Sequence, residues 1–416
     1  MVHPLLDELD IATLRAALHD QGGPLLRLSD DGTVTVSFVW IDDSAPGSPT
    51  RPVSLQCGLA DHSGHSVAMT HLEGTGVWVH EVVAPSDALV SYRFVVDDPF
   101  AGVGDTDVAE FQRLMLVAQQ GSFADPFNPE RIAPLAVLFG LTVPPEMWES
   151  VLRLPDAPPA PWFGPHDAPH GRLTSFDLTS TALGNTRTIT VYSPAVESTE
   201  ALPMVVLLDG SSFIHIGGAP RALDAAIHSG ALRPCHVAFV GEAHDATGLA
   251  NRVEELSCNP RHAEMLVHEL LPQVRQRFRV DPSPDAVVLG GASLGGLAST
   301  YTALEHAPAI GKVLSISGSY WYGSERDQIP EWLTRRLAEE PAAPFHIHQQ
   351  IGRLEDAPLA LSPGVSHLVA NRHFRDVAVA KGYRVRYIED ATAHDVVAFR
   401  MAAMRGLIDL LPGAAV

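Results

Sequence analysis

A serine at position 293 has the surroundings of a catalytic nucleophile. It lies in the motif Gly291-Ala292-Ser293-Leu294-Gly295, after the apolar run 286–289 and before a helical stretch that ends near Pro308. A GxSxG motif between a buried strand and a helix makes a tight turn that lifts the serine hydroxyl clear of the sheet. Glycine is needed beside the serine because such a turn leaves no room for β-carbons. The sequence therefore predicts a nucleophile elbow at Ser293.

A histidine near the C-terminus is the predicted general base. A serine hydroxyl is a weak nucleophile until a neighbouring base takes its proton, and in α/β-hydrolases the acid and then the histidine follow the serine along the chain. His394 lies after the last apolar strand and before the helix expected over residues 396–411. Other histidines also follow Ser293 but lie inside strand or helix patterns, where structural roles are commoner, among them His346, His348, His367 and His373.

Glu355 is the predicted acid of the triad. It follows the apolar run 345–351, and catalytic groups collect at the carboxyl ends of strands. Asp356 is the near alternative, since adjacent carboxylates cannot both face one imidazole, and Asp390 is a third candidate. The acid orients His394 and stabilises its imidazolium without taking the proton.

Two backbone amides must stabilise the oxyanion that forms when the serine attacks. One comes from Leu294, directly after the nucleophile, and the other from the loop after an earlier strand. Residues 207–213, Leu-Leu-Asp-Gly-Ser-Ser-Phe, fit that loop. Gly210 permits the tight turn and Ser211 is the expected donor. The alternative is an ordinary strand-to-helix loop.

The first 150 residues have the pattern of an antiparallel β-domain. After a short helix expected over residues 9–18, strand-like segments alternate with Gly, Ser, Asp and Pro clusters: 33–40, 51–59, 77–83 and 89–96. Alternating apolar residues at Val34, Val36 and Phe38 indicate a half-buried strand. This meander predicts an N-terminal all-β, immunoglobulin-like sandwich over residues 1–150.

A proline-rich linker is expected over residues 151–170. Its prolines remove backbone donors and forbid regular elements. Because proline-rich chain is stiff, we expect an extended strap that docks through Trp162 and Phe163.

Residues 171–416 predict an α/β-hydrolase catalytic domain. An antiparallel pair over 173–178 and 186–192 opens it, and apolar runs then alternate with helical stretches: 204–208, 235–240, 286–289, 312–316, 345–351 and 384–388. Strands that are apolar throughout are buried on both faces, as in a doubly wound, mostly parallel sheet.

Composition excludes several classes of function. The 416 residues hold 28 Lys+Arg and 49 Asp+Glu, a net charge of −21 that repels nucleic acids and anionic membranes. The three cysteines include no CxxC pair, and no HExxH motif is present, so we expect a reducing compartment and neither a protein-bound metal nor a cofactor. An acidic N-terminus and the lack of an apolar run of about 18 residues favour a cytoplasmic protein.

The chain resembles a known family, the cytoplasmic enterochelin esterases, which hydrolyse the ester backbone of tri-catecholate siderophores to release iron. The segments that carry this resemblance in the catalytic domain are 207–210, 252–259, 291–297, 317–321, 352–355, 394–395 and 406–410. Residues 38–42, 74–78, 92–94 and 124–128 are similar to the family's N-terminal domain. The resemblance supports the triad of Ser293, Glu355 and His394.

The resemblance also implies substrate-binding residues. It adds Arg252 and Glu255 as pocket residues beside the nucleophile. A guanidinium at Arg252 can both pair with and stack on an anionic, planar ferric catecholate, whereas a salt bridge with Glu254 or Glu255 is the alternative. Tyr320 and Trp321 can offer a flat face to a catechol ring or simply pack.

Three hypotheses follow. The first is a serine esterase that hydrolyses the trilactone backbone of a catecholate siderophore, with iron entering only as the substrate's chelated ferric ion. The second is a feruloyl or acetyl carbohydrate esterase, and the third a non-catalytic ferric-siderophore binder. In the first case, local positive potential must overcome the net charge at short range. Four arginines are the candidates for it: Arg221, Arg252, Arg261 and Arg353.

Overall fold

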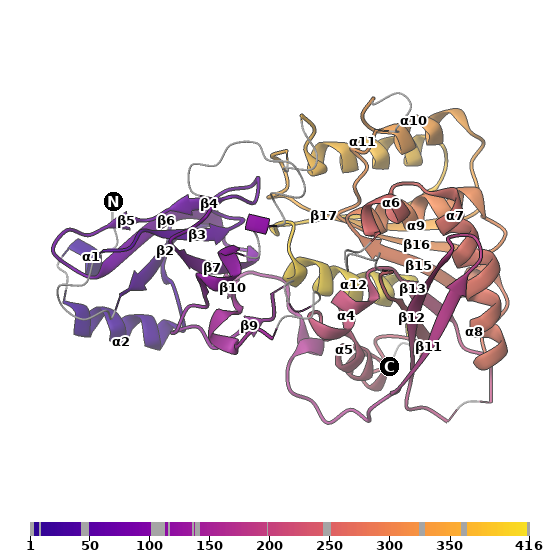
Figure 1. Cartoon of the computed structure of the whole chain (residues 1–416), viewed down its shortest axis with the longest axis horizontal. Helices are drawn as coiled ribbons and strands as arrows, with labels where there is room; N and C mark the ends of the chain where they lie inside the picture. Colours follow the sequence, from indigo (N-terminus) through magenta and orange to yellow (C-terminus); the bar gives the residue numbers. More distant parts are fainter. Residues whose placement is uncertain are drawn as a thin grey trace. The chain divides into compact units, whose positions relative to one another are not determined.

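The computed structural model describes residues 4–7, 10–42, 50–100, 113–114, 117–134, 137, 142–197, 199–243, 251–323, 329–358 and 364–413. The chain divides into two compact units (Figure 1). The first comprises Met1–Pro159, Arg353–Ala360 and Asp390–Ala398, and the second comprises Ala160–Gly352, Leu361–Glu389 and Phe399–Val416. Two loops from the C-terminal part of the sequence thus belong to the first unit. The expected division into domains 1–150 and 171–416, joined by a linker over 151–170, does not include this.

Helices α1 (Pro4–Asp7) and α2 (Ile11–Gln21) precede two antiparallel sheets in the first unit. A four-stranded sheet has the order β1-β2-β6-β5, and a six-stranded sheet has the order β4-β3-β7-β10-β9 with β8 beside β7. The strand bounds are β1 Leu25–Leu28, β2 Thr33–Ile41, β3 Val53–Cys57, β4 Ser66–Ala68, β5 Thr70–His71, β6 Val77–Pro85, β7 Leu89–Val96, β8 Ser122–Phe123, β9 Arg131–Ile132 and β10 Glu149–Arg153, with a 3₁₀ turn η2 at Pro145–Met147.

Side chains from both sheets share one core. Val34, Val36 and Phe38 of β2 are fully buried, as their alternation predicts. The Phe38 ring packs edge-on against Tyr92 of β7, with centroids 5.0 Å apart. Burying apolar side chains of this size is the main term that stabilises the unit.

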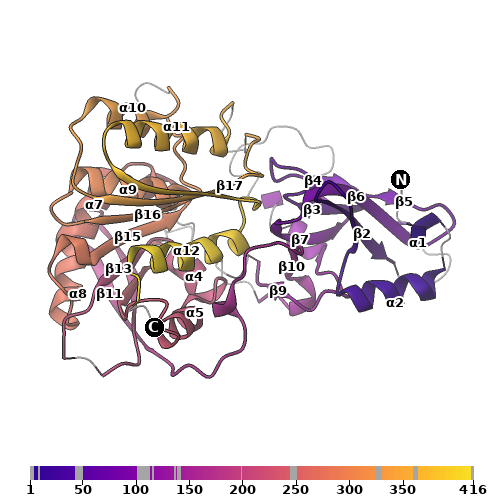
Figure 2. The same cartoon turned by 180° about the vertical axis from the view of Figure 1, so that it is seen from behind.

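An eight-stranded sheet forms the second unit, in the order β11-β12-β14-β13-β15-β16-β17-β18 (Figures 1 and 2). Its strands are β11 Arg172–Ser180, β12 Asn185–Ser193, β13 Met204–Leu207, β14 His236–Val240, β15 Val287–Ala292, β16 Lys312–Ile316, β17 His346–Gly352 and β18 Arg384–Asp390. Strands β11 and β12 pair antiparallel, and β14, β13, β15, β16 and β17 are parallel neighbours.

Helical segments cover both faces of this sheet. They are η3 Pro161–Phe163, α4 Gly210–His215, α5 Ala219–His228, α6 Arg252–Leu256, α7 Pro260–Glu264, the π-helix η4 Met265–Leu270, α8 Leu271–Arg277, η5 Pro284–Ala286, α9 Leu294–Glu305, α10 Trp332–Glu339, α11 His367–Ala380 and α12 Val396–Leu410. On β13, Met204 and Val206 enter the core with α7 to α11, while Val205 and Leu207 enter the core with α4, α5 and α12. The runs are apolar because successive residues are buried on opposite faces.

The last strand departs from that pattern. The run 384–388 was expected to be buried on both faces, but β18 ends the strand order and exposes Arg384 and Arg386. This prediction was wrong because an edge strand tolerates charged side chains, which also blunt the edge.

The proline-rich segment is docked. Residues 151–153 belong to β10, so the antiparallel β-strands of the first unit extend past residue 150. Trp162 and Phe163 of η3 pack on the core of the second unit, and the guanidinium of Arg400 lies 4.8 Å from the Phe163 ring centroid. The strap is therefore held by its aromatic residues, as its sequence predicts.

Candidate active site

Ser293 lies at a strand-to-helix turn, between β15 and α9. Its φ of 58° is in the left-handed region, which non-glycine residues seldom adopt. A β-carbon added to Gly291 would lie 2.8 Å from the backbone carbonyl carbon of Gly295. The turn thus has the geometry that the sequence predicts for a nucleophile elbow, and it is tight enough to require glycine at position 291.

Backbone amides converge at the carboxyl ends of β13 and β15. The two strands are parallel neighbours, and each leads into a helix: β13 into α4, which begins at Gly210, and β15 into α9, which begins at Leu294. N–H groups in the first turn of a helix have no partner within it. Gly210 packs so closely on β14 that a β-carbon would lie 2.5 Å from the carbonyl carbon of Phe239. Leu294, Gly210 and Ser211 are therefore suited to bind an oxyanion.

Arg252 is fixed by a carboxylate that the sequence analysis did not single out. Its Nε and Nη2 atoms donate to the two oxygens of Asp209, at 2.6 and 2.7 Å. The expected alternative, a salt bridge to Glu254 or Glu255, was wrong. Asp209 directly precedes Gly210, so this bidentate pair holds the loop that carries the amide donors.

Glu255 is engaged by an arginine from β12. Both of its oxygens accept hydrogen bonds from Arg187 at 2.8 Å, Asn185 donates to one of them, and the ion pair is buried. Hydrogen bonds from Arg187 lower the pKa of Glu255 against the opposing effect of burial. Glu255 therefore lines the pocket, as predicted, as a carboxylate already paired with Arg187, and its part in substrate binding stays a prediction.

A small hollow lies beside these groups and is lined by Asp209, Glu242, Arg252, Glu255 and His262 among others. Burial raises the pKa of Glu242, the Asp209 carboxylate adds to the rise, and a hydrogen bond from the Ser211 side chain opposes it. Burial lowers the pKa of His262 to about 4, so this imidazole is neutral at pH 7.

Tyr320 does not present a face to a ligand. It is fully buried, its hydroxyl donates to Ser315 Oγ at 2.8 Å, and its ring stacks on Phe374 with centroids 3.8 Å apart. The prediction that Tyr320 binds substrate was wrong, because the ring completes the core between β16 and α11. Trp321 is partly exposed, and its Nε1 donates to His367 Nε2 at 2.9 Å.

His394 and Glu355 form a hydrogen-bonded pair. His394 Nδ1 lies 2.7 Å from Glu355 Oε2, and the Glu355 side chain is almost completely buried. Asp356 instead lies 2.6 Å from His62 Nδ1 and is half-exposed. Of the two adjacent carboxylates, Glu355 is therefore the one that contacts the imidazole of His394. A proton held on Nδ1 by the carboxylate leaves Nε2 as the basic nitrogen.

Three of the other histidines after Ser293 have a side-chain partner. His348 is buried with Nδ1 2.9 Å from Asp409, His367 accepts from Trp321, and His373 pairs with Glu331. His346 lies on β17.

Each of the four arginines expected to create local positive potential has a carboxylate partner. The pairs are Arg221 with Asp224, Arg252 with Asp209, Arg261 with Glu254 and Arg353 with Asp87. Neighbouring carboxylates therefore balance these charges, and a local positive potential stays a prediction.

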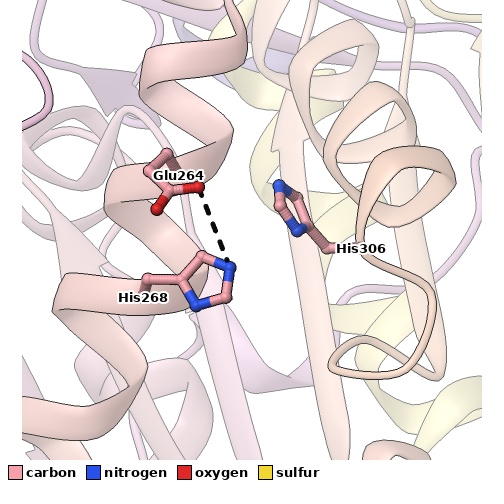
Figure 3. A group of neighbouring side chains, drawn as sticks. All are labelled: Glu264, His268 and His306. Atoms are coloured by element: carbon pink, nitrogen blue, oxygen red, sulfur yellow. Dashed lines mark ion pairs between the residues drawn. The ribbon is translucent and has the colours of Figure 1, made fainter.

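One group of potential metal ligands in the second unit lies outside these residues (Figure 3). Ligand atoms of Glu264, His268 and His306 lie within 4.8 Å of one another. Glu264 and His268 are exposed and form an ion pair at 3.8 Å, which accounts for both groups. We assign this cluster no part in the chemistry.

The strand-turn-helix serine, the paired histidine and carboxylate, and the doubly wound sheet define a serine hydrolase of the α/β class. Comparison with known proteins gives the family. Residues 180–410 match the model of a putative esterase family, and residues 35–163 match the model of the enterochelin esterase N-terminal domain. The chain therefore belongs to the enterochelin esterase family, and it is a carboxylic ester hydrolase of the serine type.

Relatives match along nearly the whole chain. An iron(III) enterobactin esterase from Dickeya dadantii (strain 3937) is 28% identical over 94% of this chain and 91% of its own length. The crystal structure of a ferric enterobactin esterase from Salmonella typhimurium covers 96% of this chain and 98% of its own, with a TM-score of 0.79 and 25% identity. That of an enterobactin esterase from Shigella flexneri, solved in the presence of enterobactin, covers 94% and 96% with a TM-score of 0.74 and 27% identity.

Within the described ranges, no helix is both long enough and apolar enough to cross a bilayer.

Three residues around the site were missed by sequence reasoning: Asp209, Glu242 and Arg187. The sequence offered one indication for Asp209, because this residue directly precedes Gly210 in the predicted oxyanion loop. Arg187 lies 68 positions from Glu255, and no sequence pattern links them.

Proposed function

We propose that this protein hydrolyses the ester bonds of a trilactone, catecholate-type siderophore and so releases its iron in the cytoplasm. The observation that carries the proposal is the match of both parts of the chain, 35–163 and 180–410, to the two models that enterochelin esterases combine. The named activity of its relatives, iron(III) enterobactin esterase, supports the same substrate class. Iron is then part of the substrate, and the reaction needs neither a protein-bound metal nor a cofactor.

The proposed reaction passes through an acyl-serine. His394 Nε2 takes the proton of Ser293, whose Oγ attacks the ester carbonyl, while Glu355 stabilises the imidazolium. The N–H groups of Leu294 and of Gly210 or Ser211 stabilise the oxyanion. His394 then protonates the leaving serine hydroxyl of the trilactone and activates the water that releases the acyl group.

Substrate recognition is proposed for Arg252 and Trp321. The Arg252 side chain is about one-third exposed and oriented by Asp209 through one edge of its guanidinium. A fixed guanidinium can pair with an anionic catecholate and stack on its ring. The partly exposed indole of Trp321 offers a second flat surface.

For the first unit, we propose an immunoglobulin-type sandwich. The antiparallel pairing of both sheets and their shared core support this assignment.

The test is direct incubation with substrate. Purified protein is mixed with ferric and iron-free forms of a cyclic tri-catecholate trilactone, and products are followed by mass spectrometry. We expect linear trimer, dimer and monomer, each cleavage adding the mass of one water, and no products from Ser293→Ala. Intact trilactone beside cleaved feruloyl or acetyl sugars would contradict the proposed substrate, and binding without turnover would indicate a siderophore carrier.

A further inference from the structure

Both loops that carry the acid and the base pack into the core of the first unit. Leu354, next to Glu355, and Ala391 and Ala393, just before His394, are buried among the side chains of the two sheets. A β-carbon added to Gly58, which directly follows β3, would lie 2.2 Å from Ala393 Cβ. The chain leaves the α/β sheet at the ends of β17 and β18 and completes the sandwich core with these residues.

Strand β7 holds the base loop by hydrogen bonds. The Leu89 N–H donates to the Ala391 carbonyl at 3.0 Å, and Leu89 and Thr392 form a parallel bridge. Two residues further along β7, the Ser91 N–H donates to Oδ2 of Asp395 at 2.9 Å. His394 is therefore bracketed on both sides by contacts to one strand.

The acid loop is held by the same unit and by the base loop. Arg353 Nη2 donates to both oxygens of Asp87 at 2.8 Å. The backbone N–H groups of Arg353 and Leu354 donate to the carbonyls of Asp390 and Thr392 at 2.7 and 3.2 Å. The two loops thus form one body in which Glu355 and His394 keep their 2.7 Å contact.

Asp395 makes two contacts that require a carboxylate. Its Oδ1 accepts from the N–H of Ala398 at 2.8 Å, which caps α12, and its Oδ2 accepts from Ser91 on β7. Asparagine has one acceptor oxygen and cannot satisfy both donors. The side chain is fully buried, and burial, with smaller contributions from Glu149 and Glu355, raises its pKa to about 6. The two hydrogen bonds lower the pKa and so offset only part of the cost of burying this acidic group.

We propose that the first unit acts in the reaction as the support that positions the acid and base, and that Asp395 is the positioning residue which fastens the His394 loop to β7. This inference rests on the proposed role of His394 as general base. Asp395 acts only through its neighbour, so its loss lowers turnover and leaves substrate binding unchanged.

Three substitutions test, one at a time, the contacts that hold the acid and base loops to the first unit. Asp395→Ser keeps a helix cap for α12 but is too short to reach β7 as well. Asp395→Asn keeps one acceptor, and Asp87→Asn weakens the clamp on Arg353 from the sandwich side. Asp97→Asn is the matched control, because Asp97 lies in the same unit but pairs with exposed Arg51. The readouts are kcat and KM for a p-nitrophenyl ester, the rate of fluorophosphonate labelling and the melting temperature.

We expect Asp395→Ser and Asp395→Asn to lower kcat and the labelling rate by about 10- to 100-fold, the effect of a misplaced catalytic group, with KM changed by less than about twofold. Asp87→Asn should give a smaller loss of the same kind and Asp97→Asn none. If the Asp395 variants do not fold, Asp87→Asn and Arg353→Ala, which removes the nitrogen that donates to Asp87, decide the matter.

A fall in melting temperature with kcat and labelling unchanged would overturn the inference and leave these residues a purely structural role. A raised KM with unchanged kcat would also overturn it and make the first unit a substrate-binding surface. A wild-type protein that is not labelled at Ser293 would overturn the proposed function and this inference together.

Discussion

Ser293 and His394 owe their surroundings to different parts of the chain. The serine turn is built from neighbours in sequence: β15 leads in, α9 leads out, and Gly291 and Gly295 meet across the turn. The histidine loop is built from distant residues, since its Asp395 bonds to Ser91, 304 positions away. A local motif can be recognised from the sequence, whereas a support of this kind depends on the whole fold.

The first prediction concerns the serine turn, which is built from residues close together in sequence. Ser293→Ala should reduce kcat by about 10⁴-fold or more, because it deletes the nucleophile and leaves only the binding and oxyanion contributions. Melting temperature should hardly change, since the backbone turn remains. Ester hydrolysis and thermal unfolding check this, with the exposed Ser175→Ala as control. Near-normal turnover by Ser293→Ala would contradict the assignment.

The second prediction concerns the acid that pairs with His394 and tests which of two adjacent carboxylates, Glu355 or Asp356, has that role. Glu355→Gln keeps the shape but loses the charge that orients His394 and stabilises its imidazolium, so kcat should fall by about 10⁴-fold. Asp356→Asn is the matched control and should change kcat little, because Asp356 pairs with His62. The assignment fails if kcat depends on Asp356 and not on Glu355.

The third prediction uses pH to probe the support. The folded-state pKa of Asp395, about 6, is above its unfolded value of 3.8. Its contribution to folding is therefore fully present below pH 3.8 and is lost as the pH rises through 6, a change of about 3 kcal/mol. The charged groups facing it are Glu149 and Glu355.

Asp395→Asn removes this titration, so its free energy of unfolding relative to the wild type should rise by about 3 kcal/mol between pH 4 and pH 7. Urea unfolding at several pH values measures the difference, with Asp97→Asn as the control. Parallel curves for the wild type and Asp395→Asn would show that Asp395 does not titrate in this range.

The fourth prediction returns to the local turn. Gly291→Ala should lower the free energy of unfolding by about 1 to 3 kcal/mol, since its β-carbon meets backbone atoms that cannot move aside. Gly164→Ala is the control, because the nearest atom to its β-carbon is 3.8 Å away. Equal stability of the two variants, measured by urea unfolding, would mean that the turn can relax.

Sequence reasoning succeeded where a function depends on near neighbours. It located the strand-turn-helix elbow at Ser293 and the two-faced burial of the parallel strands, because each has a local pattern. It preferred Glu355 and kept Asp356 as the near alternative, because the sequence does not show which of them faces the imidazole. It did not find Asp209 as the partner of Arg252, and it did not decide between a ligand face and packing for Tyr320, because pairing and burial across α6, β13 and α11 have no local signature.

Fluorophosphonate labelling of Ser293 in His394→Ala tests the central claim most directly, because it measures whether the imidazole of one unit activates the hydroxyl of the other. We predict labelling at least about 10³-fold slower than in the wild type, with the protein still folded. Labelling at the wild-type rate would contradict the account.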